Sequence, residues 1–317
     1  MAQVKNYAYN GRASFVVETL EEAAKDYENV YRLRLDQRGY TKVPEVIQRM
    51  TNLVSLDLSG NAIENLGTSL KGLTKLEVLK LNGNQLKHLP LESLSDCILL
   101  KELHLKSNQI TRIDTSINQF KYLTKLDVGD NQINFIDAEI NLPRLKSFKA
   151  EHNKLEECPS FLKHSPKLGY LNLGANQIPS IKHLAQMTKL ISLNIGDNPI
   201  ESIRPVLKLS NLEFLIIDWI DLSTENWDDL TVNLKWLRVL SAEHCRLTTV
   251  PSWVDSLKHL EELSLIMNDI NQLPTFLYTK RRLRKIWLGY NPVSKATLAK
   301  LQQALKRCTV YGSPANH

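Results

Sequence analysis

Cysteine is scarce in this chain, and its four copies are widely separated. Because they form no CxxC pair, a structural zinc site and a disulfide framework are both disfavoured. Few and isolated thiols suit a reducing compartment. The first fourteen residues also lack the apolar stretch that a secretory signal needs. We therefore expect a cytoplasmic protein, and leave open export by a route that uses no such signal.

Long apolar runs and catalytic motifs are missing as well. No run approaches the roughly 18 apolar residues that a membrane-spanning helix needs. Yet 43% of the 317 residues are hydrophobic, which is enough for a large core. The chain contains no P-loop, HExxH or GxSxG motif. The sequence therefore predicts neither an enzyme activity nor a cofactor or metal site.

What the chain does contain is an internal repeat. The frame LxxLxLxxNxL recurs at intervals of 22 to 25 residues, as in "LVSLDLSGNAI" (53–63), "LEVLKLNGNQL" (76–86) and "LISLNIGDNPI" (190–200). With a weaker first copy at 30–40, we count twelve copies up to residue 293. One copy, "LEFLIIDWIDL" (212–222), has Ile220 in the ninth place, where most of the others have Asn.

The frame has a physical reading of its own. In LxxLxL the fourth and sixth residues lie on one side of a short strand, because side chains alternate with period two. A single strand cannot bury that apolar side, but stacked coils can, and their strands then form a parallel sheet. A buried Asn amide is costly unless it is hydrogen-bonded. We therefore expect a ladder of Asn side chains that bond the backbone of adjacent coils.

These copies resemble the leucine-rich repeat family. The resemblance covers roughly residues 30 to 293, and the 22-residue copies are similar to the shorter repeats of phosphatase regulators. It implies an α/β fold, a right-handed solenoid with a concave parallel sheet. Segments such as "VPEVIQRMTN" (43–52) and "VPSWVDSLKH" (250–259) look like the convex segments of such repeats.

Both ends of a solenoid need a cap. We predict one domain over 1–317, with an N-terminal cap (1–29), the repeats (30–293) and a C-terminal helical cap (294–317). The first cap includes a helix over 19–30, with Thr19 and Glu22 at capping-box spacing. The second includes a helix over 294–308 with Ser294 as N-cap, and "TVYG" adds a final strand. Both caps resemble those of bacterial cytoplasmic or cell-surface leucine-rich repeat proteins.

Two features suggest chemistry, and each has a simpler structural explanation. The pair His244-Cys245 could be a thiol site, but Cys245 takes the ladder place, where it is expected to be buried and inert. The segment "TKRRLRK" (279–285) belongs to a C-terminal end, 270–317, with nine basic and no acidic residues. It could bind nucleic acid or an acidic partner. Because Leu283 and Ile286 belong to the repeat frame, solvated coil surface is favoured and nucleic-acid binding is disfavoured.

In the family that this chain resembles, function lies in strand residues outside the core. These are polar in the first half of the chain and become aromatic and apolar in the second half. Contiguous exposed apolar patches mark binding surfaces, and aromatic residues ringed by charge are typical of interface hot spots. The predicted partner-binding residues are Tyr170, Phe214, Ile216, Asp218, Trp219, Val239, Glu243, His244, Ile266, Met267, Trp287 and Tyr290.

Two alternatives to a binding patch stay open. The segment "STENWDDLTVNLKW" (223–236) could form a longer helix that covers Trp219, or the patch could be a self-association surface. We expect Trp227, Trp236 and Trp253 to pack on convex segments. The sequence is compatible with three functions. The chain could be a non-enzymatic protein-binding scaffold or a regulatory subunit of a phosphatase or GTPase. With less support, it could bind nucleic acid or an acidic partner through the basic end.

Overall fold

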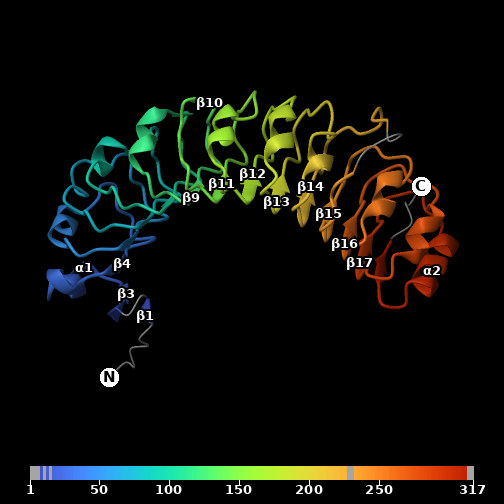
Figure 1. Cartoon of the computed structure of the whole chain (residues 1–317). Coiled ribbons are helices and arrows are strands. Elements are labelled where there is room, and N and C mark those ends of the chain that lie inside the picture. The colour runs from blue at the N-terminus through green and yellow to red at the C-terminus, as the bar shows by residue number, and fades with distance from the viewer. Residues whose placement is uncertain (1–7, 10–11, 14–15, 227–231, 313–317) are drawn as a thin grey trace, which may run out of the picture. The chain divides into compact units, whose positions relative to one another are not determined.

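The computed structural model describes residues 8–9, 12–13, 16–226 and 232–312. Contacts divide the chain into two compact units, Met1–Lys154 with Pro159–Lys167 and Leu155–Cys158 with Leu168–His317. Each unit has its own run of parallel strands on one side of its coils and short helices on the opposite side (Figure 1). This arrangement is the α/β solenoid with a parallel sheet that the sequence predicts. The organisation as one domain stays a prediction.

Among its described residues, the first unit contributes seven parallel strands to its main sheet, most of them three residues long. Their order follows the chain, and neighbouring frame residues are in register, as in Leu56 beside Leu79. The strands are β3 (Val16–Val17), β4 (Arg32–Arg34), β5 (Ser55–Asp57), β6 (Val78–Lys80), β7 (Glu102–His104), β9 (Lys125–Asp127) and β11 (Ser147–Lys149). Two small pairs are separate from this sheet: β1 (Ala8–Tyr9) with β2 (Arg12–Ala13), which are antiparallel, and β8 (Arg112–Ile113) with β10 (Phe135–Ile136), which are parallel.

The second unit also contains seven parallel strands in chain order. They are β12 (Tyr170–Asn172), β13 (Ser192–Asn194), β14 (Phe214–Ile216), β15 (Val239–Ser241), β16 (Glu262–Ser264), β17 (Lys285–Trp287) and β18 (Thr309–Tyr311). Strand β18 is the predicted "TVYG" strand, and it pairs with β17 in register.

The convex segments form short 3₁₀ helices and turns. In the first unit these are η1 (Tyr27–Asn29), η2 (Glu45–Arg49), η3 (Glu92–Leu94), η4 (Thr115–Gln119) and η5 (Ser160–His164). In the second unit they are η6 (Lys182–Gln186), η7 (Val206–Lys208), η8 (Ser252–Ser256) and η9 (Thr275–Thr279). One turn of such a helix suffices, because η2 to η9 each bury only one or two side chains, such as Ile47 in η2 and Leu277 in η9, and η1 buries none.

The core of each unit consists of the frame residues. Leu56, Leu79 and Leu103 occupy the middle of their strands and are fully buried, as are Leu215 and Leu263 in the second unit. Burying one such side chain stabilises the fold by about 1.5–3 kcal/mol. The strands are short because the core needs only the fourth and sixth frame residues from each coil.

The predicted asparagine ladder is present, and Asn131 shows its geometry. Its Nδ2 donates to the carbonyls of Leu105 (3.0 Å), Val128 (3.0 Å) and Gly129 (2.9 Å), while its Oδ1 accepts from the Ile110 N–H (2.9 Å). The side chain therefore joins its own coil to the preceding one. The buried members are Asn61, Asn84, Asn108, Asn131, Asn153, Asn176, Asn198, Asn268 and Asn291.

The ladder is interrupted at two consecutive coils, where Ile220 and Cys245 take the Asn place and are fully buried. The Ile200 N–H, which an Asn at 220 would have bonded, donates to the Asn198 carbonyl instead (2.8 Å). The Cys245 thiol donates to the Ile217 carbonyl (3.2 Å). A backbone carbonyl thus replaces the missing amide oxygen as the acceptor for the Ile200 N–H.

The N-terminal helix is shorter than predicted. The cap is present, because Thr19 Oγ1 accepts from the Glu22 N–H (3.1 Å). However, α1 spans only Leu20–Ala23, and the segment to residue 30 continues as a turn and η1. Ala23 is the one buried residue of α1, and after the turn and η1 the chain places Val30 in the core.

The C-terminal helix α2 spans Lys295–Ala304, with Ser294 as its N-cap, and ends four residues before the predicted boundary. Leu301 and Leu305 are buried as expected, while Leu298 is half-buried. The Gln302 side chain bonds the Cys308 carbonyl (2.7 Å) and the Val310 N–H (3.1 Å), which ties β18 to the helix. The capping roles of α1 and α2 stay predictions.

The longer helix that the sequence allows over 223–236 is not found in the described part of that segment. Residues 223–226 and 232–236 form turns and irregular backbone, and residues 227–231, which include Trp227, lie outside the described residues. Arg204 bonds Glu225 (3.1 Å) and the Asn226 carbonyl (2.8 Å), and the Asn233 N–H donates to the Leu207 carbonyl (2.7 Å). These bonds to the preceding coil hold the segment in a non-helical path.

Candidate functional site

The outward residues of the second unit's sheet form two rows, because the register aligns the first residues of neighbouring strands and, separately, the third residues. The first row is Tyr170, Ser192, Phe214, Val239, Glu262, Lys285 and Thr309. The second row is Asn172, Asn194, Ile216, Ser241, Ser264, Trp287 and Tyr311.

Three of the predicted residues lie together on β14 and β15. Phe214 stands beside Val239 in the first row, and Ile216 lies two residues along β14 on the same face. Phe214 is 39% exposed, and the other two are half-buried. Tyr170 is exposed but separated from Phe214 by Ser192 of the intervening strand, so it does not join this cluster.

A third row of residues lies in the turns that follow the strands. Each of its members directly precedes the ladder position that Asn usually occupies. Its backbone is left-handed in every one of these coils, with φ between 53° and 60°. In the second unit this turn row is Ala175, Asp197, Trp219, His244, Met267 and Tyr290. A bulky side chain is uncommon in this conformation. The last four residues therefore occupy places that Gly, Asn or Asp would fill with less strain.

Trp219 and His244 form the centre of the turn row. Their rings stack with centroids 3.6 Å apart and planes 10° apart. Trp219 is 58% exposed, so the described residues do not cover it. Hydrogen bonds from the Trp219 N–H to Glu243 and from the His244 N–H to Ile266 link the turns of successive coils. The stacked pair thus forms an open aromatic platform beside Phe214 and Ile216.

A second aromatic group lies at the C-terminal strands. Trp287 stacks on Tyr311 with centroids 5.5 Å apart and planes 11° apart. The Lys285 ammonium lies 5.7 Å from the Trp287 ring centre, a cation–π contact. Tyr290 in the turn row is 63% exposed. Sequence reasoning missed Tyr311, although its place in a short alternating strand puts it on the same face as Trp287.

Two carboxylates that are partly withdrawn from solvent, Asp218 and Glu243, directly precede Trp219 and His244 in the chain. Asp218 accepts from the Glu243 N–H (2.8 Å), and it also bonds the Ser241 hydroxyl. Glu243 accepts a short hydrogen bond from the Ser264 hydroxyl. Sequence reasoning predicted both acids but missed the two serines, which the register brings beside them from the second row.

Burial raises the pKa of the Asp218 carboxyl above its ordinary value, and the Glu243 carboxylate adds to this, while hydrogen bonds from the Glu243 N–H and the Ser241 hydroxyl oppose it. Because its pKa is raised in the folded state, Asp218 stabilises the fold at pH values below the unfolded-state pKa of about 3.9. This stabilisation is lost as the pH rises through the folded-state pKa. Each unit of difference corresponds to about 1.4 kcal/mol.

We therefore expect Asp218→Asn to unfold at a higher temperature than the wild type at pH 7. The amide can still accept from the Glu243 N–H, and it carries no charge to desolvate. The advantage should shrink toward pH 4, because lowering the pH protonates more of the wild-type carboxyl and so reduces the charge that burial disfavours. Thermal unfolding followed by circular dichroism at both pH values tests this. Asp197→Asn, an exposed acid of the turn row, is the control, and an equal gain there would contradict the assignment.

A ladder of alternating charges borders the first row. It runs Glu213, Arg238, Glu261 and Arg284 on the residues just before β14 to β17, and its ion pairs measure 3.8, 3.1 and 4.0 Å in turn. The Arg238–Glu261 pair has two hydrogen bonds, at 3.1 and 3.2 Å. Hydrogen bonds from Arg238 lower the pKa of the Glu261 carboxyl. The apolar residues of the face thus have a charged rim on this side.

The first unit presents a different face. Lys80 pairs with Asp57 (3.3 Å) and Lys125 with Glu102 (2.8 Å) across neighbouring strands. Exposed pairs of this kind contribute about 0–1 kcal/mol. They keep the sheet solvated, in contrast to the aromatic second unit.

No thiol on this face is set up as a nucleophile. Cys245 is fully buried in the ladder place, as predicted, and burial raises its pKa to about 12. The thiolate is the reactive form, so Cys245 is unreactive at neutral pH. Within residues 8–9, 12–13, 16–226 and 232–312, no group of three or more His, Cys, Asp and Glu side chains is placed to hold a metal ion. The helices of those same ranges are all too short or too polar to cross a membrane.

Comparison with known proteins agrees with this geometry. The leucine rich repeat family matches residues 28–86, 51–110 and 98–155. The chain is a leucine-rich repeat protein. The structure of the Listeria monocytogenes internalin inlF is similar over 92% of this chain and 82% of that one, with a TM-score of 0.73 and 22% identity. A Leptospira interrogans leucine-rich repeat protein is similar over 94% and 99%, with a TM-score of 0.64 and 21% identity.

This leucine-rich repeat protein matches two curated relatives over only part of their length. The Schizosaccharomyces pombe adenylate cyclase is 24% identical over 86% of this chain and 16% of that protein. A protein phosphatase 1 regulatory inhibitor subunit homologue from Arabidopsis thaliana is 30% identical over 46% of this chain and 45% of that one. The chain thus spans less than half the length of either relative. The leucine-rich repeat fold is typical of protein–protein interaction.

Proposed function

We propose that this chain is a non-enzymatic protein-binding scaffold, whose partner contacts the outward face of the second unit's sheet. The observation that carries the proposal is Trp219. Its ring is mostly exposed, stacks on His244, and occupies a left-handed turn that disfavours large side chains. Strained residues of this kind concentrate at functional sites.

The surroundings of Trp219 have the composition of an interface centre. Phe214, Ile216 and Val239 provide an apolar surface on two adjacent strands. Hot spots combine large aromatic side chains with a rim that excludes water, and the Glu213–Arg238–Glu261 ion pairs supply such a rim along one side.

The partner should combine an apolar anchor with cationic groups. Asp218 and Glu243 directly precede Trp219 and His244 in the turns after β14 and β15, and they are only partly exposed. A Lys or Arg from the partner would complement their charge, and complementary charge favours specificity and association rate.

A reducing, cytoplasmic location fits the free cysteines of the described residues, which are all buried.

Affinity capture from a source lysate tests the proposal. The wild type is compared with a Phe214→Ser, Trp287→Ala double variant, and with a control that carries Lys125→Ser and His104→Ala at the matching strand positions of the first unit. We expect a specific partner to be retained by the control and lost by the aromatic double variant, with all three proteins folded by circular dichroism.

A partner that the aromatic double variant retains, and that the control loses, would move the site to the first unit. Analytical sedimentation of the same proteins distinguishes self-association from binding of another protein. A wild-type dimer that the aromatic double variant cannot form would show that a second copy of the chain binds this face.

The similarity to the Arabidopsis phosphatase 1 regulatory inhibitor subunit supports a second candidate, regulation of a bound enzyme. If the captured partner is a phosphatase or GTPase, the purified chain should change its turnover, and the aromatic double variant should not. If the enzyme's turnover is unchanged at a saturating concentration of this chain, scaffolding would remain the proposed function.

A further inference from the structure

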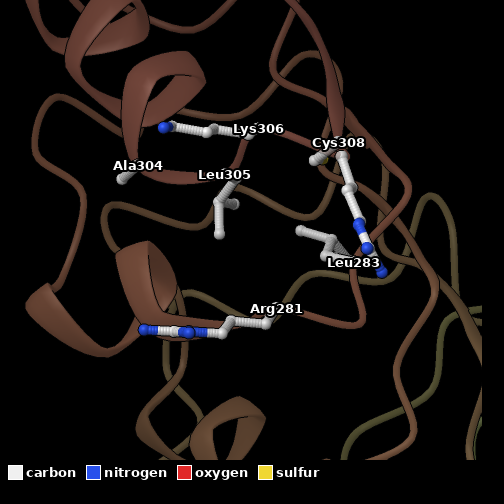
Figure 2. Close-up of a pocket in the computed structure, with 7 residues that line it drawn as sticks. Arg281, Leu283, Ala304, Leu305, Lys306 and Cys308 are labelled. Carbon is white, nitrogen blue, oxygen red and sulfur yellow. The ribbon is translucent and has the colours of Figure 1, made fainter.

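A pocket of about 600 Å³ opens at the C-terminal end of the second unit (Figure 2). Its walls come from two parts of the chain, the turn before β17 and the segment that ends α2 and leads into β18. Figure 2 shows Leu283 and Leu305 pointing into the same space, with Arg281 and Lys306 on opposite sides of it. The lining residues are Arg281, Leu283, Ala304, Leu305, Lys306, Arg307 and Cys308.

A second, smaller pocket of about 290 Å³ adjoins the first, because Arg281, Leu283 and Arg307 line both. Its other lining residues include Arg282 and Arg284, so the two pockets together form one basic trough. We use the name basic trough for the surface lined by Arg281, Arg282, Arg284, Lys306 and Arg307.

The charge of the basic trough is largely unneutralised. Arg281, Lys306 and Arg307 are exposed, and within the part of the chain that the structure describes no ion pair joins them to a carboxylate. Glu261, which lines the smaller pocket, is already bound in a two-bond pair with Arg238. Its distance to Arg284 is 4.0 Å, so it does little to offset the guanidinium groups around it.

The alternating charge ladder also ends here on a cation. The order Glu213, Arg238, Glu261, Arg284 would continue with an acid, but the register of β17 with β18 puts Cys308, a buried thiol, in the next place. Arg284 therefore has an acidic neighbour on one side only. A carboxylate supplied from outside would complete the alternation.

We propose that the basic trough binds an acidic peptide segment, in which carboxylates pair with the guanidinium groups of Arg281, Arg284 and Arg307, and an apolar side chain rests on the aliphatic wall at Ala304, which is exposed. Guanidinium groups bind carboxylates through two parallel hydrogen bonds. The site lies apart from the sheet face of the proposed function, and it is tested with different variants.

Two features favour a peptide over a nucleic acid. The inner wall of the larger pocket is aliphatic, with Leu283, Ala304 and Leu305, and it offers no aromatic ring on which a base could stack. The smaller pocket also contains the Glu261 carboxylate, beside which a peptide can place a neutral residue, whereas a phosphate backbone carries a charge at every nucleotide.

Fluorescence anisotropy with the full chain tests the proposal. The probe is a fluorescein-labelled peptide of alternating Glu and Leu, and a peptide with Gln in place of Glu and a single-stranded oligothymidine serve as comparisons. We expect the Glu peptide to bind the wild type, and the Arg281→Gln, Arg307→Gln double variant to weaken this binding about tenfold. The matched control is Lys295→Gln with Lys300→Gln, which removes the same charge from exposed residues of α2 outside the pocket.

Three results would overturn the proposal. One is equal weakening by the α2 control, which would reduce the effect to diffuse charge. Another is tighter binding of the oligothymidine than of the Glu peptide, which would make this end a nucleic-acid site. The third is no binding of the Glu peptide up to about 1 mM, the weak limit of specific recognition.

Discussion

Replacing Asn131 with Leu should destabilise the first unit by about 2–4 kcal/mol. The substitution keeps a side chain of similar size but removes all four hydrogen bonds of the amide. The three carbonyls it bonds each keep another donor: Leu105 has Asn108 Nδ2, Val128 has Asn153 Nδ2, and Gly129 has the Ser107 N–H. The main loss is therefore the buried Ile110 N–H, which has no other acceptor.

Two measurements test the expected loss of stability in Asn131→Leu. Chemical denaturation gives the shift in midpoint, and hydrogen exchange detects faster exchange of the peptide that contains Ile110. Gln132→Leu is the matched control, because Gln132 is the exposed neighbour and its substitution should stay within about 0.5 kcal/mol. If Asn131→Leu were no more destabilising than this control, the ladder would not support the coils in the way the geometry indicates.

Ile220 explains why the expected loss is not larger. At that natural exception the Ile200 N–H bonds the Asn198 carbonyl two residues away (2.8 Å). Coils can therefore re-pair a ladder donor within themselves when the neighbouring sequence permits it. A similar rearrangement at Ile110 would place the cost of Asn131→Leu at the lower end of the range.

The sequence predicts the repeating core well, because the alternation of LxxLxL leaves one side of each strand apolar. Leu56, Leu215 and Leu263 are buried for that reason, and Asn131 is buried because its amide has four partners. Helix ends are less predictable. The capping bond of Thr19 was evident from its spacing to Glu22, but the early end of α1 depends on where Val30 enters the core.

The candidate site was predictable as a set of residues but not as an arrangement. The exposure of Phe214 follows from alternation, whereas the stacking of Trp219 on His244 depends on how two turns of different coils align. Trp236 shows the same limit: it was expected to pack, but it is 53% exposed, with its ring 4.8 Å from that of His259. Trp253 is buried as expected. The basic character of residues 279–285 was evident from the sequence, but the pocket that they form with residues 304–308 was not, because its walls meet only in the folded chain.

The second large effect concerns Trp219, whose substitution should separate binding from stability. Trp219→Asn relieves a left-handed conformation at φ 60°, which costs about 1–2 kcal/mol for most residues and less for Asn. It also removes the stack on His244, worth about 0.5–1.5 kcal/mol. These terms nearly cancel, so stability should change by less than about 1 kcal/mol.

Affinity for the captured partner should fall about thirtyfold or more, as expected when a central aromatic hot spot worth about 2 kcal/mol is lost. Calorimetric titration of the purified partner measures this, with thermal unfolding run on the same samples. Trp236→Asn is the control, because it removes an equally exposed tryptophan that lies outside the strand and turn rows. The opposite pattern, a large loss of stability with unchanged affinity, would make Trp219 a packing residue. Retained stability with weakened binding would instead mean that the coil accepts backbone strain because the partner needs that ring.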